Sequence, residues 1–216
     1  MTWPGRTVAL IGGTGHMGIG LARRLAQAGM DVIIGSRDGT KARAVASSLG
    51  FASLRGRHNP EAAGTAEVIV LTVPYAAHRS TLLAIAGDTD GKVVVDTTVP
   101  LVRNSSLHVI RPPARSAAEE ARELLPRARI VSGFHTVSAD LLADLTRTLH
   151  GDVLLCGDDA GAKEIAAELV RAIRMRPVDV GALSQAHALE QLAGLLLALN
   201  RRHRRRDLGV QISGLD

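Results

Sequence analysis

Three glycines in G-x-G-x-x-G spacing follow directly on an apolar run at 7–11. The turn consists of Gly13, Thr14, Gly15, His16, Met17 and Gly18. Glycines in this pattern let backbone N–H groups approach a pyrophosphate, while the helix that follows directs its positive end towards it. The apolar positions of residues 16–28 have helical spacing, so the motif lies between a strand and a helix. The turn therefore predicts a dinucleotide site, whereas the same triplet without this context would fit an ordinary tight turn.

The next apolar run, "VIIGSRDGTK" at 32–41, lacks a carboxylate at the strand end, where a dinucleotide-binding unit usually has Asp or Glu. Ser36, Arg37 and Lys41 occupy this region instead. A carboxylate accepts hydrogen bonds from the adenosine 2′-hydroxyl, whereas a hydroxyl and two cations suit a negatively charged 2′-phosphate. The sequence therefore favours NADP, against the simpler interpretation that Arg37 and Lys41 are ordinary surface charges.

Three further segments follow predicted strands and should border the ligand crevice, because ligands bind outside the carboxyl ends of parallel strands. They are "TVPYAAH" at 72–78, "TTVPLV" at 97–102 and "GFHTVS" at 133–138. His135 lies in the last segment, where it suits contact with a coenzyme ring or proton handling. Most single histidines are instead packed or on the surface, and the same alternative holds for His78, a further candidate for coenzyme contact.

Residue patterns of common catalytic machineries are missing from the chain. No G-x-S-x-G, H-E-x-x-H or Y-x-x-x-K pattern occurs, and Cys156 has no base at recognisable spacing. As the only cysteine, Cys156 also cannot form an intrachain disulfide or a cysteine-rich metal site, and we expect no metal. These absences favour a reaction without a strong acid or base. Direct hydride transfer between two redox cofactors is such a reaction, because positioning and exclusion of water supply most of the effect.

Alternating strands and helices must position these residues. Strands are predicted at 7–11, 31–34, 67–74, 92–100, 128–136, 151–158 and 176–181, and helices at 16–28, 39–49, 75–86, 116–125, 160–175 and 183–203. We therefore predict an α/β fold, namely a Rossmann-like, doubly wound, mainly parallel sheet with a small C-terminal α/β extension. Residues 101–113 break the pattern with "NSS" and "PP" and predict an irregular loop, a candidate lid or ligand edge.

The positive charge of the chain is local. The formal net charge is +5, but "RRHRRR" at 201–206 contains five arginines, and the other 21 Lys and Arg balance the 21 Asp and Glu. This cluster is either a solvated helix end or a contact with an anionic ligand or partner. Only 2% of residues are aromatic, which argues against nucleic-acid binding on stacked rings. Without a signal pattern or an 18-residue apolar run, we expect a cytoplasmic protein that does not bind membranes.

Over nearly its whole length the chain resembles the NADPH-dependent coenzyme F420 reductases, also called F420H2:NADP+ oxidoreductases. The similar segments include "ALIGGTGHMGIGLARRLA", "IIGSRDGTKA", "VLTVPYAAH", "RSAAEEARELLP", "IVSGFHTVSA", "DVLLCGDD", "RPVDVGALS" and "DLGVQISG". The resemblance implies an enzyme that moves hydride between NADP(H) and the deazaflavin coenzyme F420. Its partners would be these small-molecule coenzymes, and it would form a homodimer.

The resemblance also implies positions for the site residues. The 2′-phosphate of NADP would be held by Ser36, Arg37 and Lys41, and the deazaflavin would stack near the nicotinamide. The further implied contacts are Thr14, His16, Met17, Val73, Pro74, Pro100, His135, Val137, Leu208 and Gly209. Residues 1–100 would form the NADP-binding core, and residues 101–216 would continue the fold without a linker and carry the F420 side and the terminal helix.

Two segments depart from the family pattern, "VRNSSLHVIRPPA" at 102–114 and "RRHRRR". Both border the expected deazaflavin side, so a relative that had exchanged F420 for another acceptor would look similar. Two alternatives therefore stay open. One is an NADPH-dependent reductase of a small imine, carbonyl or flavin, and the other is a non-catalytic NADPH-sensing module.

Overall fold

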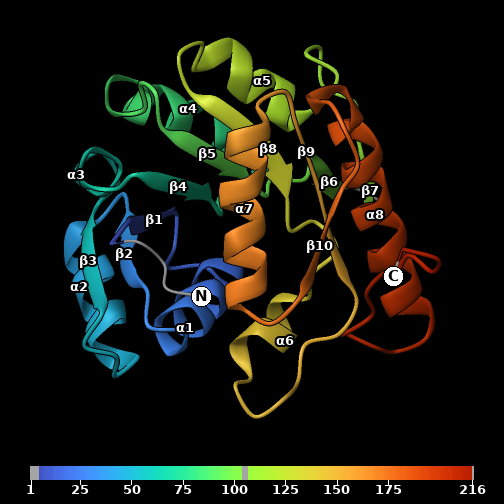
Figure 1. The fold of residues 1–216 in the computed structure, drawn as a ribbon, viewed down its shortest axis with the longest axis horizontal. Helices are drawn as coiled ribbons and strands as arrows, with labels where there is room; N and C mark the ends of the chain where they lie inside the picture. The colour runs from blue at the N-terminus through green and yellow to red at the C-terminus, as the bar shows by residue number, and fades with distance from the viewer. Residues whose placement is uncertain (1–4, 104–106, 216) are drawn as a thin grey trace.

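An eight-stranded sheet runs through the computed structural model, which describes residues 5–103 and 107–215 (Figure 1). The strand order is β10-β9-β8-β5-β4-β1-β2-β3, and neighbouring strands are parallel except for β8 and β9. The strands are β1 (Thr7–Ile11), β2 (Asp31–Ser36), β3 (Leu54–His58), β4 (Val68–Leu71), β5 (Val93–Asp96), β8 (Arg129–Gly133), β9 (Asp152–Gly157) and β10 (Arg176–Asp179). The predicted mainly parallel, doubly wound sheet is thus confirmed.

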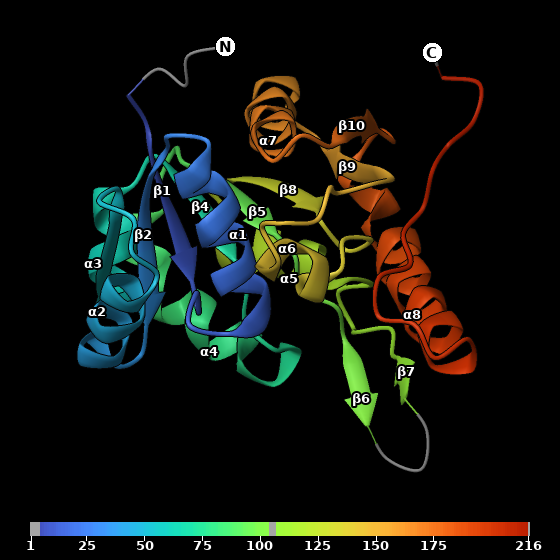
Figure 2. The same cartoon turned by 90° about the horizontal axis from the view of Figure 1, so that it is seen from below.

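Helices cover both faces of this sheet (Figure 2). One face carries α1 (His16–Gln27), α2 (Gly39–Ser48), α6 (Ala139–Ala143) and α7 (Ala160–Ala172). The other face carries α3 (Asn59–Thr65), α4 (Tyr75–Ile85), α5 (Ala117–Leu124) and α8 (Ala186–Arg202). Short 3-10 turns lie at Ala86–Asp88 and Leu183–Gln185. No helix in the described ranges is long and apolar enough to cross a bilayer.

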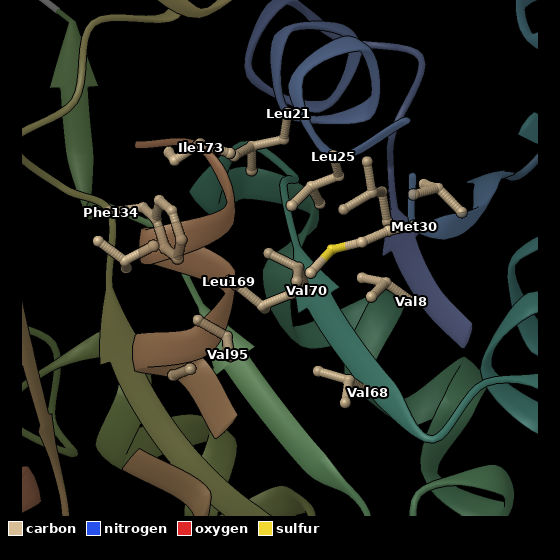
Figure 3. Packing of buried hydrophobic residues seen from close by; sticks show 14 of the residues in the cluster. Val8, Leu21, Leu25, Met30, Val68, Val70, Val95, Phe134, Leu169 and Ile173 are labelled. Atoms are coloured by element: carbon tan, nitrogen blue, oxygen red, sulfur yellow. The ribbon is translucent and has the colours of Figure 1, made fainter. Parts of the chain in front are cut away.

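Successive residues of each inner strand pack into hydrophobic clusters on opposite faces of the sheet. Val8 and Leu10 of β1 pack in the cluster beneath α1 and α7, whereas Ala9 and Ile11 belong to the cluster beneath α3 and α4. Side chains of a strand alternate between its two faces, so a strand covered on both sides must be apolar at every position. Figure 3 shows the first cluster, in which Met30 fills the space between the strands and α1.

The segment predicted as an irregular loop at 101–113 contains a small antiparallel hairpin, so that prediction was wrong. Its strands are β6 (Leu101–Arg103) and β7 (Leu107–Val109), and residues 104–106 lie outside the described ranges. The hairpin projects from the sheet beside α8 (Figure 2). Gly194 of α8 permits this approach, because a Cβ atom there would lie 2.6 Å from Cγ2 of Val109.

The remaining differences concern short or polar elements. β3, α3 and α6 were not predicted, and β3 in particular has the largely polar sequence "LRGRH". Three predicted strands end at least three residues early: β4 stops at Leu71, β5 at Asp96 and β8 at Gly133, rather than at 74, 100 and 136. The residues after these ends leave the ladder and form walls of the cleft described next.

Candidate active site

A cleft of about 710 Å³ opens at the carboxyl ends of β1, β2, β4, β5 and β8. This is the edge of an open parallel sheet where ligands bind, and the volume is typical of a ligand site. We call it the first chamber. Among the predicted site residues, those that line it are Thr14, Gly15, His16, Met17, Ser36, Arg37, Lys41, Val73, Pro74, His135 and Val137. The structure thus brings predicted site residues from four separate segments to one cleft.

The glycine turn at the end of β1 depends on close backbone packing. A Cβ atom on Gly18 would lie 2.4 Å from Cα of Gly13, so this glycine lets α1 approach the turn. Gly12 has a φ of +76°, and a Cβ atom there would lie 2.4 Å from Cγ1 of Val73. Gly13 and Gly18 are therefore structural parts of the turn and do not line the first chamber, whereas Gly12 lines it and lies outside the predicted motif.

The N-terminal end of α1 suits an anion. Its N-cap is Gly15, and no side chain in the described part of the chain caps it. Helices α2, α5, α6 and α7 each have a capping side chain that accepts hydrogen bonds from their first-turn N–H groups, whereas α3, α4 and α8, like α1, lack one among the described residues. Among the uncapped helices, α1 is the one that begins at the glycine turn. An uncapped helix start leaves donors and the positive end of the helix dipole for a ligand. Asn59 supports the turn, because its Oδ1 accepts a hydrogen bond from the Gly12 N–H at 3.4 Å.

The groups at the end of β2 are arranged for a second anion. Ser36 is buried, and its Oγ accepts a hydrogen bond from the Asp38 N–H at 3.2 Å, which leaves its own O–H to donate. The Asp38 carboxylate caps α2 by accepting from the N–H groups of Thr40 and Lys41 at 2.8 and 3.1 Å. Arg37 and Lys41 are exposed, and neither pairs with a carboxylate in the described residues. Two cations and one hydroxyl therefore face the cleft beside a carboxylate that is already engaged.

The opposite end of the cleft is formed by the turn after β8. Phe134 is buried with a φ of +66°, which is unusual for a bulky residue, and this turn places His135 on the cleft wall. Both ring nitrogens of His135, and Oγ1 of Thr98 on the neighbouring wall, are buried without a hydrogen-bond partner in the described residues. Burial lowers the pKa of His135 to about 4, although the charge of Asp96 opposes the shift. The imidazole is therefore neutral near pH 7, and both of its nitrogens are covered by protein in this structure.

His78 does not reach the cleft. Its side chain has no exposed surface, and Nε2 lies 2.7 Å from Oδ2 of Asp96, with Nδ1 3.4 Å from Oε2 of Glu120. Burial alone would lower the pKa of His78, but the charge of Asp96 and the hydrogen bond to it raise it above its usual range. The second Asp96 oxygen accepts the Thr98 N–H at 2.9 Å. His78 thus supports the wall after β5 from behind, and the geometry gives no basis for the direct coenzyme contact predicted from its position.

A second chamber of about 420 Å³ adjoins the first and shares Val99, His135 and Val137 with it. Its outer wall comes from α8 and the segment after that helix, including Leu196, Asn200 and Leu208. Leu208 therefore lies where the sequence predicted a second ligand. Gly209 and Pro100 line neither chamber, although each is next to a residue that does. Contact of any of these residues with a coenzyme stays a prediction.

Two residues of the site had no signal in the sequence analysis. Asn59 and Asp96 act through hydrogen bonds to the Gly12 backbone and to the buried His78, and such roles depend on contacts between distant segments. Within the described residues, no group of three or more His, Cys, Asp or Glu is arranged to hold a metal ion.

Comparison with known proteins gives consistent similarities. A family model described as "NADP oxidoreductase coenzyme F420-dependent" matches residues 7–100. The chain is 39% identical to the F420-dependent NADP reductase of Methanothermobacter thermautotrophicus, over 96% of this chain and 95% of the relative. It is 33% identical to the protein of that name from Methanocaldococcus jannaschii, over 97% and 99%. The crystal structure of a putative F420-dependent NADP reductase from Arthrobacter sp. FB24 superposes with a TM-score of 0.86 at 26% identity, covering 97% and 100% of the two chains.

Proposed function

The chain belongs to the F420-dependent NADP reductase family, and we propose that it transfers hydride directly between NADP(H) and coenzyme F420. The observation that carries the proposal is the pair of chambers that share Val99, His135 and Val137. One chamber has a phosphate-binding end, and the two meet at a wall where two rings can face each other.

The first chamber suits NADP. The uncapped start of α1 would hold the pyrophosphate, and Ser36, Arg37 and Lys41 would hold the 2′-phosphate. The nicotinamide end would then lie towards Thr98 and His135, which line the cleft away from its phosphate-binding end.

The second chamber suits the deazaflavin of F420. Leu196, Val137 and Leu208 provide apolar surface for a flat ring system, and Asn200 is fixed by the Leu208 N–H, which donates to its Oδ1 at 3.2 Å. Val99 and Val137 border both chambers, so they set how closely two ligands approach.

The residues of the site position ligands and exclude water. When both coenzymes are bound, they supply the hydride donor and the hydride acceptor themselves. His135 is neutral near pH 7 and borders both chambers, so it would shape the wall between the two ligands and would not donate an imidazolium proton. Proximity and orientation account for the rate in this mechanism.

A spectroscopic assay tests this function. Oxidised F420 absorbs visible light and its reduced form does not, so NADPH plus the protein should bleach oxidised F420 in a catalytic manner. Absence of bleaching, combined with NADPH consumption by a small imine, carbonyl or free flavin, would replace F420 with that acceptor. NADPH binding without turnover on any of these would indicate a sensing module.

We also propose a cytoplasmic homodimer in which residues 1–100 form the NADP-binding core and residues 101–216 carry the F420 side. Leu195 of α8 supports the dimer, because this large apolar residue is 54% exposed and lies outside the second chamber. Sedimentation velocity of the parent and of a Leu195→Glu variant would test the assembly.

A further inference from the structure

The basic segment at 201–206 does not simply continue α8. The helix ends at Arg202, and the chain reverses through Arg204, which has a φ of +51°. The N–H of Arg205 donates to the Asn200 carbonyl at 2.8 Å, and the N–H of Arg204 donates to the Arg201 carbonyl at 3.4 Å. These are the two hydrogen bonds of a Schellman helix end. The turn carries Arg205 and Arg206 back towards the sheet, where both line the second chamber.

The arginines of this segment have different roles. Arg205 donates to both carboxylate oxygens of Asp207 at 3.0 and 3.2 Å, and Arg147 shares this carboxylate at 2.7 Å. The hydrogen bonds from Arg147 and Arg205 lower the pKa of Asp207 to about 2, so Arg205 is held in a structural ion pair. The side chain of Arg206 is 86% exposed and lies 3.9 Å from Oδ2 of Asp140. An exposed ion pair at this distance is weak, and Arg206 therefore has charge to offer a ligand.

Arg206 places its charge at the edge of the second chamber. The second chamber is apolar along α8, with Ala193, Leu196 and Leu197, and becomes cationic at its outer end. Asp140 is the one carboxylate among the described lining residues of that chamber, against Arg205 and Arg206. A solvated helix end would account for Arg201 and Arg202, which lie in the last helical turn near the negative end of the dipole. It does not account for cations beyond the reversal that border a cavity.

We propose that Arg206, supported by Arg205, forms a subsite for the anionic tail of the second coenzyme. The inference rests on the proposed function, because it takes F420 as the occupant of the second chamber. The coenzyme carries a phosphate and a tail of carboxylates, so a ring in the apolar part of the chamber would extend its tail past the outer, cationic end. The subsite would distinguish tailed deazaflavins from the tail-less deazaflavin nucleoside, which shares the ring system.

The chain offers a matched control for this proposal. Leu196, Leu197 and Asn200 lie on one side of α8 and line the chamber, and at 100° per residue Arg202 lies on the opposite side of the helix. Arg202→Gln and Arg206→Gln remove the same charge within a few residues of each other. Arg205 is left unchanged, because its loss would also disturb Asp207.

The experiment measures binding rather than turnover. Dissociation constants of oxidised F420 and of the tail-less deazaflavin are measured by fluorescence quenching with saturating NADP+ present, at two salt concentrations. The parent should bind the tailed coenzyme more tightly, and the ratio of the two constants should fall as salt rises, because exposed charges are screened over about 8 Å at physiological ionic strength. Arg206→Gln should reduce this ratio about two- to fivefold at low salt, as expected for one exposed charge. Arg202→Gln should leave it nearly unchanged.

Each other outcome has a distinct meaning. Equal ratios for the parent and Arg206→Gln at low salt would overturn the subsite while leaving the deazaflavin chamber in place. An equal fall for both variants would also overturn it, because a general charge effect would then suffice. If neither deazaflavin binds and NADPH does not bleach F420, the proposed function itself fails and the subsite with it.

Discussion

At the scale of single residues, the end of β2 has a carboxylate that borders a ligand site but caps a helix. Asp38 borders the first chamber, two residues after Ser36. Its Oδ1 accepts both N–H groups at the start of α2, and its own N–H donates to Oγ of Ser36. The hydroxyl proton of Ser36 and the cations of Arg37 and Lys41 are the hydrogen-bond donors that face the cleft.

The first prediction concerns Arg37. Arg37→Glu should raise KM for NADPH by about 10- to 100-fold, because a charge-assisted hydrogen bond worth about 1.5–3 kcal/mol becomes a repulsion. KM for NADH should change much less. Initial rates with both nucleotides give these constants, and Arg55→Glu is the control, since Arg55 is an exposed cation on β3 that does not line the first chamber. Equal use of NADPH and NADH by the parent would contradict the assignment.

The second prediction concerns His135. Because its pKa is near 4, the ring is neutral over the usual assay range and cannot serve as an imidazolium acid. His135→Ala should therefore lower the rate of hydride transfer by less than about 100-fold, the lower end of general acid–base contributions. The rate is measured in single turnovers, and the parent's pH profile should show no His135 ionisation between pH 6 and 8. A loss of several more orders of magnitude in a folded variant would make His135 an obligatory acid.

The third prediction concerns Glu190 of α8, which is fully buried. Its Oε1 accepts the Ala117 N–H at 2.8 Å, and burial raises its pKa to about 8. Above the ordinary pKa of 4.5 the unfolded chain loses the Glu190 proton, whereas the folded protein keeps it up to about pH 8. The free energy of unfolding is therefore highest below pH 4.5 and falls as pH rises towards 8. Glu190→Gln keeps a neutral acceptor, so the variant should gain stability relative to the parent as pH rises, by at most about 1.4 kcal/mol per pH unit. Urea unfolding at pH 5 and pH 8 measures this, and a pH-independent difference would contradict it.

At the scale of elements, helix α1 is held against the sheet through glycine. Gly18→Ala would bring a Cβ atom to 2.4 Å from Cα of Gly13, so either the helix or the turn must move. We expect a loss of about 1–3 kcal/mol in unfolding free energy, as for other overpacked sites, together with weaker NADP binding. Gly87→Ala is the matched control, because no atom lies within 4 Å of its added methyl group and its φ is not positive. Similar melting curves for the two variants would show that α1 has room to shift.

Elements with long apolar runs were predictable from the sequence, and those with few residues or polar strands were not. β1 and β5 are apolar at nearly every position because both faces of the sheet are covered, which gives a strong signal. β3 lies at the edge of the sheet and carries Arg55 and Arg57, so its pattern resembles a loop. The strands of the β6–β7 hairpin contain three residues each, too few to show alternation.

The parts of the site that are local sequence patterns were predictable, and the parts that depend on contacts between distant segments were not. The glycine turn and the cations after β2 are local patterns, and the structure places them at one cleft. Asn59 and Asp96 form hydrogen bonds with residues 47 and 18 positions away, and no local sequence pattern predicts such contacts. His78 was misjudged because its place near a strand end is visible in the sequence, whereas its burial between two carboxylates is not.

At the scale of the whole molecule, the segment at 208–215 is tied to the far edge of the sheet, and its first residue, Leu208, lines the second chamber. The N–H of Asp152 donates to the Val210 carbonyl at 2.6 Å, and the N–H of Ile212 donates to Oδ2 of Asp152 at 2.7 Å. Arg176 bridges the same carboxylate, at 2.8 Å to each oxygen, and the Ile212 carbonyl at 2.6 Å. Strands β9 and β10 thus hold the C-terminal segment that closes the chamber.

The fifth prediction tests this attachment. In Asp152→Asn the charge is lost and only one acceptor oxygen remains for Arg176 and Ile212, so the segment should open more often. Because hydrogen bonds to charged groups contribute about 1.5–3 kcal/mol, we expect amide exchange at Ile212 to accelerate by about 10- to 100-fold. Binding of F420 should weaken through Leu208, while NADP+ binding should stay within about twofold of the parent, because a site without shared partners is energetically independent.

The control and the pH dependence sharpen this test. The control is Asp179→Asn, at a residue that lies on β10 with Arg176 and pairs with Lys163 of α7 in an exposed ion pair. This substitution does not touch the C-terminal segment, so it should change neither amide exchange at Ile212 nor F420 binding. The hydrogen bonds from Arg176 lower the pKa of Asp152 against the opposing effect of burial. The attachment should therefore persist above the ordinary pKa of 3.8 and weaken as pH falls through the lower folded value. Unchanged exchange at Ile212 in Asp152→Asn would show that the segment is held by its apolar contacts alone, and the second chamber would then not depend on β9 and β10.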